Sequence, residues 1–485
     1  MMEILSRNFL HPDIQFQDDE AGLKQFQEFE DTITFWKTIL YEGYNLRSGD
    51  LVSIWDASIR FDYICLFIAA AELGLRLVLV PDKPTSPDGK TAKLDAIVQQ
   101  YGKIKVTLID TVSESQPAVL AAAHRYSEKI VQTEIFNTYT ISDHSIYLDL
   151  KEKIFAKPDS DVIITTTSGT TGEPKLATYT HQQLYRIGKR NVNAYGYEDA
   201  ITCHSRNMHH SFVLLAHFLP SLTGTKYHYT KVIAEQSSEE KMLDFAKFIN
   251  DNHITKLVVS YKMLLDSLLR SMINANMQFS HSVDLIVGGF YVTEDYVDKL
   301  IKTNTNSLIS TFGSNETFGP LFLRKVYQTT PVEGFEINCL GNVCDDFYKL
   351  VLTTDNKLTV ECPALFNNSV LLDEGFKFRS NGDVLHMGRD NFYRIDHKDF
   401  SFKDLDNITQ NHVNGKYTIT VDIPYQRLYL VVWSGSVDFD LLNNEVNEVI
   451  GLKFEAWAEL DSEEYNNEFK LDQDKIRNYF RNQRS

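Results

Sequence analysis

A regular alternation of apolar strands with helices constrains the fold of this chain more than any other feature. Residues 49–55 (GDLVSIW) predict a turn and a buried strand, residues 63–75 predict an Ala- and Leu-rich helix, and residues 77–81 predict a second strand. This length fits a right-handed parallel crossover. A similar unit follows at 92–109. The pattern therefore predicts a doubly wound α/β scaffold.

Length and charge limit the organisation and the partners. A chain of 485 residues with 43% apolar residues predicts two to four globular domains or subdomains. Its net charge of −18 argues against a nucleic-acid partner or an anionic membrane surface, because both require clustered Lys and Arg. The basic cluster that stands out, near the end of the chain, fits a solvated helix face. It contains Lys475, Arg477, Arg481 and Arg484.

Cysteine usage and the N-terminal region favour a cytoplasmic protein. The five cysteines are odd in number, scattered, and lack the spacing of a metal site. They therefore predict reduced thiols. The sequence has no signal-peptide pattern and no apolar run of transmembrane length, so no membrane span is expected.

A hydroxyl-rich loop follows a short apolar run at 161–164. It has the sequence TTTSGTTGEPK at 165–175 and precedes a helix-compatible stretch from His181, which predicts strand, loop and helix. Two glycines permit close backbone approach, and Lys175 adds a compact positive charge, so the loop could cradle a polyphosphate. It is not a Walker loop, because only two residues separate Gly169 from Gly172. The alternative is a polar surface turn.

This loop resembles the phosphate-binding signature of the adenylate-forming superfamily. That superfamily includes acyl-CoA and aryl-CoA synthetases, adenylation domains of peptide synthetases, and luciferases. The resemblance implies that the loop binds the phosphates of ATP. The residues assigned to ATP on this ground are Thr167, Ser168, Gly169, Thr170, Thr171, Gly172 and Lys175.

Two further segments resemble nucleotide-binding motifs of the same superfamily. A predicted strand at 283–287 ends in Gly288-Gly289, which resembles the loop that contacts adenine in relatives. Residues 311–316 (TFGSNE) resemble the Tyr-Gly-x-Thr-Glu motif, so Phe312, Gly313 and Asn315 are also assigned to ATP. Phe312 lacks the tyrosine hydroxyl, and Asn315 replaces the threonine. Glu316 matches, and a hard carboxylate suits Mg²⁺.

Two other motifs add candidates for the sugar and the substrate. Residues 379–391 resemble the Thr-Gly-Asp and Gly-Arg-x-Asp motifs, which assigns Asp383 and Arg389 to ATP. A carboxylate accepts two ribose hydroxyls well. The hinge is assigned to Asp390 and Asn391. His210 precedes a Leu-Pro-x-Leu-x-x-Gly-like segment, and its role stays open between lining the acid site and packing in the core.

The end of the chain resembles the small domain of the superfamily. Predicted strands at 417–421 and 428–433 and a helix at 441–450 make a small α+β domain, and residues 471–477 (LDQDKIR) resemble the closing Gly-Lys-Ile-x-Arg motif. The resemblance implies a large domain at 1–389, made of doubly wound α/β subdomains plus a β-rich part. It also implies a small mobile domain at 390–485 that carries the catalytic Lys475. The glycine expected after the hinge is missing.

The resemblance implies an AMP-forming ligase. A carboxylate attacks the α-phosphate of ATP, with Lys475, Lys175, Glu316 and His210 as catalytic candidates. The acyl group then passes to a thiol, either coenzyme A or a carrier protein, or to an amine. The substrate acid is open, although the chain lacks a Phe-Asp pair near His210 that would favour an amino acid. Two alternatives stay open, a catalytically silent relative that binds ligands and an ATP hydrolase or kinase.

Overall fold

The computed structural model describes two compact units of the chain. The first comprises residues 1–354, 358–372 and 377–386, and the second comprises 355–357, 373–376 and 387–485. The predicted boundary between 389 and 390, with the roles attached to it, stays a prediction. The described residues are 3–483 except for 19–21, 56–60, 79–88, 110–116, 133–143, 168–174, 206–212, 232, 234–236, 260–261, 289–291, 315–316, 318, 334, 337–338, 354–355, 364, 366–367, 389–391, 396–397, 423–426, 461–465, 468–469 and 472.

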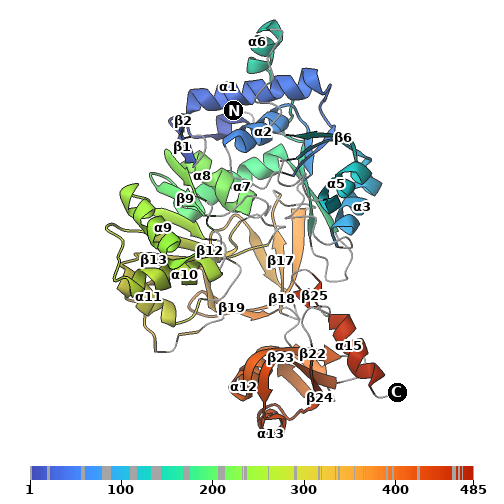
Figure 1. Cartoon of the computed structure of the whole chain (residues 1–485), viewed down its shortest axis with the longest axis vertical. Helices are drawn as coiled ribbons and strands as arrows, with labels where there is room; N and C mark the ends of the chain where they lie inside the picture. The colour runs from blue at the N-terminus through green and yellow to red at the C-terminus, as the bar shows by residue number, and fades with distance from the viewer. Residues whose placement is uncertain are drawn as a thin grey trace. The chain divides into compact units, whose positions relative to one another are not determined.

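A six-stranded sheet of the first unit confirms the predicted crossover. Its strand order is β6-β5-β3-β4-β7-β8, in which β3 and β4 are parallel and only β7 and β8 pair in an antiparallel sense. Helix α2, labelled in Figure 1, lies between β3 and β4 in the chain. The bounds are β3 Leu51–Trp55, α2 Phe61–Glu72, β4 Arg76–Val78, α3 Gly89–Tyr101, β5 Ile104–Ile109, α5 Pro117–Tyr126, β6 Ser127–Gln132, α6 His144–Glu152, β7 Asp161–Thr167 and β8 Lys175–Thr180.

The second sheet has thirteen strands and a parallel centre. Its order is β16-β17-β18-β19-β15-β14-β13-β12-β11-β9-β10-β1-β2, and the strands from β13 to β1 run parallel to one another. The strands are β1 Gln15–Asp18, β2 Gly22–Gln25, β9 Ile201–His204, β10 Tyr227–Thr230, β11 Lys256–Val259, β12 Asp284–Gly288, β13 Ser307–Phe312, β14 Phe322–Tyr327, β15 Cys339–Val343, β16 Lys349–Leu352, β17 Lys357–Glu361, β18 Ser369–Phe378 and β19 Asp383–Gly388.

Helices cover the parallel centre on both faces. Leu285 and Val287 of β12 pack in a core with α9, α10 and α11, which lie together in Figure 1, while Ile286 packs with residues of α7. A parallel sheet buried on both faces explains the continuous apolar runs. The remaining helices of this unit are η1 Arg7–Phe9, α1 Phe26–Thr38, the π-helical turn η2 Ile39–Gly43, α7 His181–Tyr195, the π-helical turn η4 Val213–Phe218, α8 Leu219–Gly224, α9 Glu239–Asp251, α10 Lys262–Asn274 and α11 Asp295–Thr303.

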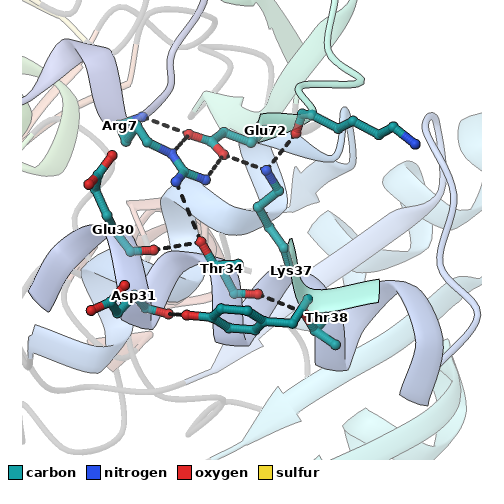
Figure 2. A network of polar contacts seen from close by, with 9 residues as sticks. Arg7, Glu30, Asp31, Thr34, Lys37, Thr38 and Glu72 are labelled. Carbon is teal, nitrogen blue, oxygen red and sulfur yellow. Dashed lines mark hydrogen bonds and ion pairs between the residues drawn. The ribbon is translucent and has the colours of Figure 1, made fainter. Parts of the chain in front are cut away.

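A buried ionic network joins η1, α1 and α2 (Figure 2). Arg7 donates to both carboxylate oxygens of Glu72, through Nε at 2.8 Å and Nη2 at 2.6 Å, and Lys37 Nζ donates at 2.9 Å. Burial alone would raise the pKa of Glu72, but its hydrogen bonds with Arg7 and the charge of Lys37 lower it. Glu72 therefore stays ionised and balances one of the two buried cations.

The second unit contains a three-stranded sheet with helices on both faces. Even-numbered residues of β23, such as Leu430, pack with α12 and α13, and odd-numbered ones, such as Tyr429 and Val431, pack with α15. The bounds are β20 Phe392–Ile395, β21 Lys398–Ser401, α12 Phe402–His412, β22 Val413–Asp422, β23 Arg427–Val437, α13 Phe439–Val449, β24 Phe454–Glu459, β25 Asn466–Asn467, β26 Lys470–Leu471 and α15 Gln473–Asn482. Among the described residues, no helix combines the length and apolar composition needed to cross a membrane.

Candidate active site

The predicted phosphate loop connects two antiparallel strands. Thr167 at the end of β7 pairs in register with Lys175 at the start of β8, and residues 168–174 lie outside the described part of the chain. The expected order of strand, loop and helix lacks β8, whose six residues come between the loop and the helix. Helix α7 begins at His181, where the hydroxyl of Thr180 accepts from the amide of Gln183. The positive end of the α7 dipole therefore lies near Thr180, where β8 ends, and not near Lys175, where β8 begins.

The carboxyl ends of the central parallel strands gather several predicted residues. Strands β9, β11, β12 and β13 run parallel and end at one edge of the sheet, which is where ligands bind in open α/β sheets. Gly288 ends β12 beside Thr311 of β13, and a Cβ atom built on Gly288 would lie 3.0 Å from Thr311 Oγ1. The absence of a side chain at Gly288 therefore allows the Thr311 side chain to lie close to it. Gly289 lies outside the described residues.

Two motifs that are far apart in sequence meet at Phe312. This residue ends β13, and its ring centroid lies 5.2 Å from that of His386 in β19 and 5.8 Å from that of Phe322 in β14. His386 follows Asp383 by three residues in the same strand. The structure thus brings the end of β13 next to β19, and these two strands carry segments predicted to share a nucleotide site.

Asp383 begins β19 in a tight turn. The side-chain amide of Asn381 donates to Asp383 Oδ2 at 2.7 Å, and the amide of Asp383 donates back to Asn381 Oδ1 at 3.1 Å. Gly382 has a φ of +90°, which a residue with a side chain adopts only with strain. These contacts orient the carboxylate. Arg389, Asp390 and Asn391 follow β19 and lie outside the described residues.

The turn after β13 carries the predicted magnesium ligand. The amide of Ser314 donates to Thr317 Oγ1 at 3.1 Å, and the amide of Thr317 donates to the carbonyl of Ser314 at 3.1 Å. Gly313 leads into this turn. Asn315 and Glu316, between the two bonded residues, lie outside the described part of the chain. The turn itself is therefore defined by residues on each side of Glu316.

Lys475 lies in the second unit. It occupies the first turn of α15, and its side chain is exposed. The neighbouring Ile476 and Phe480 are buried against β23, where the ring of Phe480 stacks on that of Tyr429 at 4.5 Å. The helix is thus fixed to its own sheet while Lys475 faces outward from it.

A buried cluster of histidines was not predicted from the sequence. His204 Nε2 and His228 Nδ1 each lie 3.1 Å from Ser221 Oγ, and His217 packs on the Tyr195 ring at 4.5 Å. Burial lowers the pKa of His217 and of His228 to about 3. These rings are therefore neutral near pH 7. His210, the histidine that the sequence singled out, lies in 206–212, outside the described residues.

Another residue missed by sequence reasoning is Arg190 of α7. It pairs with Asp345, 155 positions further along the chain, with Nε 2.7 Å from Oδ2. Burial disfavours the charged form, but the hydrogen bond to Asp345 and the charge interactions with neighbouring groups together outweigh it and raise the pKa of the guanidinium. No local pattern in the sequence marks a pair so widely separated.

Comparison with known proteins points to the same family as the sequence motifs. The family described as AMP-binding enzyme matches residues 26–341, about two thirds of the chain. A curated relative, the Bacillus subtilis (strain 168) protein YdaB, is provisionally named an acyl-CoA ligase. It is 22% identical over 300 residues, which cover 58% of this chain and 56% of YdaB. The match therefore spans little more than half of that relative.

Solved structures match over nearly the full chain. O-succinylbenzoate coenzyme A synthetase (MenE) from Bacillus subtilis, in complex with AMP, matches 97% of this chain and 96% of its own with a TM-score of 0.74 at 14% identity. The amide bond synthetase McbA from Marinactinospora thermotolerans matches 98% of each chain with a TM-score of 0.73 at 12% identity. At these identities the likeness establishes the α/β fold. Together with the family match over 26–341, it shows that this chain belongs to the AMP-binding enzyme family.

Proposed function

We propose that this chain is an adenylate-forming ligase that activates a carboxylic acid. A carboxylate oxygen attacks the α-phosphate of ATP, giving an acyl-adenylate and pyrophosphate. The observation that carries the proposal is the contact between Phe312 and His386, because it places two nucleotide motifs of this family side by side. The carboxylate is ionised at neutral pH, so the reaction needs no general base.

The residues would act mainly by supplying positive charge and hydrogen bonds. Attack of one anion on another is slow unless charge developing at the phosphorus is neutralised. We assign Lys175 to the β- and γ-phosphates, Lys475 to the transition state, and Asp383 to the ribose. His210 stays a candidate for the acid site. The proposed nucleotide site is completed by the seven loop residues Thr167, Ser168, Gly169, Thr170, Thr171, Gly172 and Lys175, and by Gly288, Gly289, Phe312, Gly313, Asn315 and Arg389.

The proposed Mg²⁺ ion fits a site built around one carboxylate. Within the described part of the chain, no three His, Cys, Asp or Glu side chains gather to hold a metal. Mg²⁺ bound with ATP does not need such a cluster, because one or two carboxylates, phosphate oxygens and water complete its shell. Glu316, in the turn between Ser314 and Thr317, supplies the carboxylate in this proposal. The ion would neutralise phosphate charge.

A panel experiment tests this function directly. Exchange of labelled pyrophosphate into ATP should depend on one class of acid among fatty, aryl and amino acids. A silent relative, which the loss of the tyrosine hydroxyl at Phe312 favours, would show ATP binding without exchange for every acid. Exchange with amino acids alone would contradict the expectation that amino acids are disfavoured.

Loss of either nucleotide-site carboxylate should reduce adenylate formation sharply. Glu316→Ala removes the proposed magnesium ligand, and Asp383→Ala removes an acceptor worth about 1.5–3 kcal/mol, or about 10- to 100-fold in kcat/KM for ATP. The measurement is pyrophosphate exchange at varied ATP, with thermal unfolding to check the fold. Glu333→Ala, at an exposed carboxylate between β14 and β15, is the control. Wild-type exchange in Glu316→Ala would remove the magnesium assignment.

Lys475 should act in the first half-reaction only. In this proposal the small domain turns to present a different face in the second step, so Lys475 is in the site during adenylation alone. Lys475→Ala should slow adenylation about a hundredfold, by the scale of a single electrostatic donor of ~3 kcal/mol.

The same variant supplied with preformed acyl-adenylate should transfer the acyl group at a near wild-type rate. Lys175→Ala should instead weaken ATP binding and slow adenylation only in part. Equal loss of both half-reactions in Lys475→Ala would mean that Lys475 has a structural role.

The acyl acceptor is proposed to be a carrier-protein thiol or an amine in preference to coenzyme A. The glycine expected after the hinge is missing from 390–402, and a backbone with side chains leaves less room for a pantetheine arm. Product analysis with each acceptor tests this. Efficient acyl-CoA formation at micromolar coenzyme A would contradict it.

We also keep the cytoplasmic location and the domain roles as proposals. All five cysteines are free thiols, as expected in a reducing compartment. The domain proposal assigns ATP and acid binding to residues 1–389 and the mobile catalytic lysine to 390–485. It rests on the family resemblance of the motifs on each side of the hinge residues Asp390 and Asn391.

A further inference from the structure

The connection between β13 and β14 is held by a buried arginine of another element. Arg190 lies in α7, the helix that follows the phosphate-loop hairpin, and only 6% of its side chain is exposed. Its Nε and Nη2 atoms donate to the two carboxylate oxygens of Asp345 at 2.7 and 3.0 Å. Nη2 also donates to the carbonyl of Pro320 at 2.5 Å. One guanidinium therefore joins α7 to this connection and to the segment after β15.

The neighbouring residues pack against the same pair. A Cβ atom built on Gly319 would lie 2.5 Å from Asn191 Oδ1 and 2.9 Å from Arg190 Nη1, so the connection lies directly against α7. The hydroxyl of Tyr348 donates to the carbonyl of Thr317 at 2.7 Å. The guanidinium of Arg190 also lies 4.9 Å from the Tyr348 ring centroid. The described residues Thr317, Gly319 and Pro320 of this connection are thus held by α7 and Tyr348.

We propose that Arg190 and Asp345 are positioning residues for adenylation, because they hold Gly319 and Pro320, which closely follow Glu316 in the chain, against α7. The inference rests on the proposed function and deepens it. Neither residue touches the substrates in this account. They act through the backbone of Gly319 and Pro320, and through these residues on the proposed magnesium ligand Glu316, which lies nearby in the chain.

The geometry favours positioning over a contribution to stability alone. A planar guanidinium donates to a carboxylate in two parallel bonds and still reaches a carbonyl, whereas a lysine ammonium is a point charge without this fork. Arg190→Lys therefore keeps the charge but loses the simultaneous contact with Asp345 and Pro320. A displacement of about 1 Å in a catalytic group can cost on the order of a hundredfold in rate.

The test compares Arg190→Lys and Asp345→Asn with Arg186→Lys. Arg186 is on the same helix, but it is exposed and pairs with Glu3 at 2.8 Å, so it is a matched control. In both test variants, kcat for pyrophosphate exchange should fall about 10- to 100-fold, with KM for the acid within about twofold. The Mg²⁺ concentration for half-maximal rate should rise. The control should match the wild type in all three values.

Amide hydrogen exchange separates this inference from the proposed function. Without any substrate, the amides of Ser314 and Thr317 should exchange faster in the two test variants than in the wild type, and the control should not differ. An inactive wild type would overturn the proposed ligase, while the amide exchange would still report whether the pair holds the turn. If the amides of Ser314 and Thr317 exchange hydrogen at the same rate in the test variants as in the wild type, the inference is overturned. The inference is also overturned if the loss of kcat in the variants is proportional to their loss of thermal stability and the Mg²⁺ concentration for half-maximal rate does not change.

Discussion

Acidification from pH 7 to pH 5 should destabilise the first unit by several kcal/mol. Four histidines, His181, His204, His217 and His228, are at most 4% exposed. Burial lowers the pKa of His181 to about 4 and that of His217 and His228 to about 3, and it lowers the pKa of His204 well below its usual value. An unfolded histidine has a pKa of about 6.5. Below that pH the unfolded chain binds more protons than the folded one.

The direction of this pH effect on stability follows from proton linkage. The free energy of unfolding falls as pH falls wherever the unfolded state binds more protons, so this stability is fully present above about pH 6.5. It is lost as the pH falls toward the folded pKa values. Each buried histidine should cost about 1.4 kcal/mol per pH unit in this window, or about 2 kcal/mol at pH 5. Four together should cost about 8 kcal/mol.

His181 offers the sharpest test of this pH dependence. It is fully buried, and no described residue hydrogen-bonds to either ring nitrogen. His181→Leu should therefore reduce the slope of unfolding free energy against pH by about 1.4 kcal/mol per unit. Urea unfolding between pH 5 and pH 7 measures the slope. His124→Leu, at an exposed position of α5, should leave it unchanged, and an unchanged slope in His181→Leu would contradict the account.

Removal of Glu72 should destabilise the first unit by about 3–5 kcal/mol. Glu72 is fully buried and accepts from Arg7 and Lys37, so Glu72→Ala leaves two buried cations without a counter-charge. The Nζ atom of Lys37 also donates to the carbonyl of Lys153 at 2.5 Å, which prevents it from reaching solvent without breaking another contact. Urea unfolding at pH 7 measures the effect.

An exposed pair provides the matched control for Glu72. Lys247 and Asp244 lie 3.4 Å apart on α9, and both side chains are exposed. Asp244→Ala should change the unfolding free energy by less than about 1 kcal/mol, because water screens exposed charges. A loss below about 1 kcal/mol in Glu72→Ala as well would show that the buried network contributes little to stability.

Local sequence patterns predicted the helices and strands that have a continuous apolar run or a periodic apolar face. The apolar run at 51–55 and the Ala-rich helix after it correspond to β3 and α2, and the start of α7 at His181 agrees with the sequence. Strand β8 was missed because Lys175–Thr180 is short and follows a loop that is itself rich in hydroxyls. Its strand conformation depends on pairing with β7, which a local pattern does not reveal.

The candidate site residues likewise divide into those that local motifs predict and those that depend on contacts between distant segments. Motif order indicated the residues at the ends of β12, β13 and β19, because these positions are marked by glycines and acidic residues at short spacing. The Arg190–Asp345 pair and the histidine cluster depend on contacts between distant segments, and a polar residue on a helix predicts a solvated face until its burial is known. The missing hydroxyl at Phe312 was visible in sequence, while the His386 ring beside it was not.

The most direct test of the proposed function is the identity of the products formed from ATP. The purified chain is incubated with ATP, Mg²⁺ and the acid that gives the strongest pyrophosphate exchange, and the nucleotides are separated and quantified. The account predicts that pyrophosphate and AMP, counted both free and joined to the acyl group as the acyl-adenylate, form in equal amounts and only in the presence of the acid. Formation of ADP and phosphate would contradict it, and so would the absence of turnover with every acid of the panel.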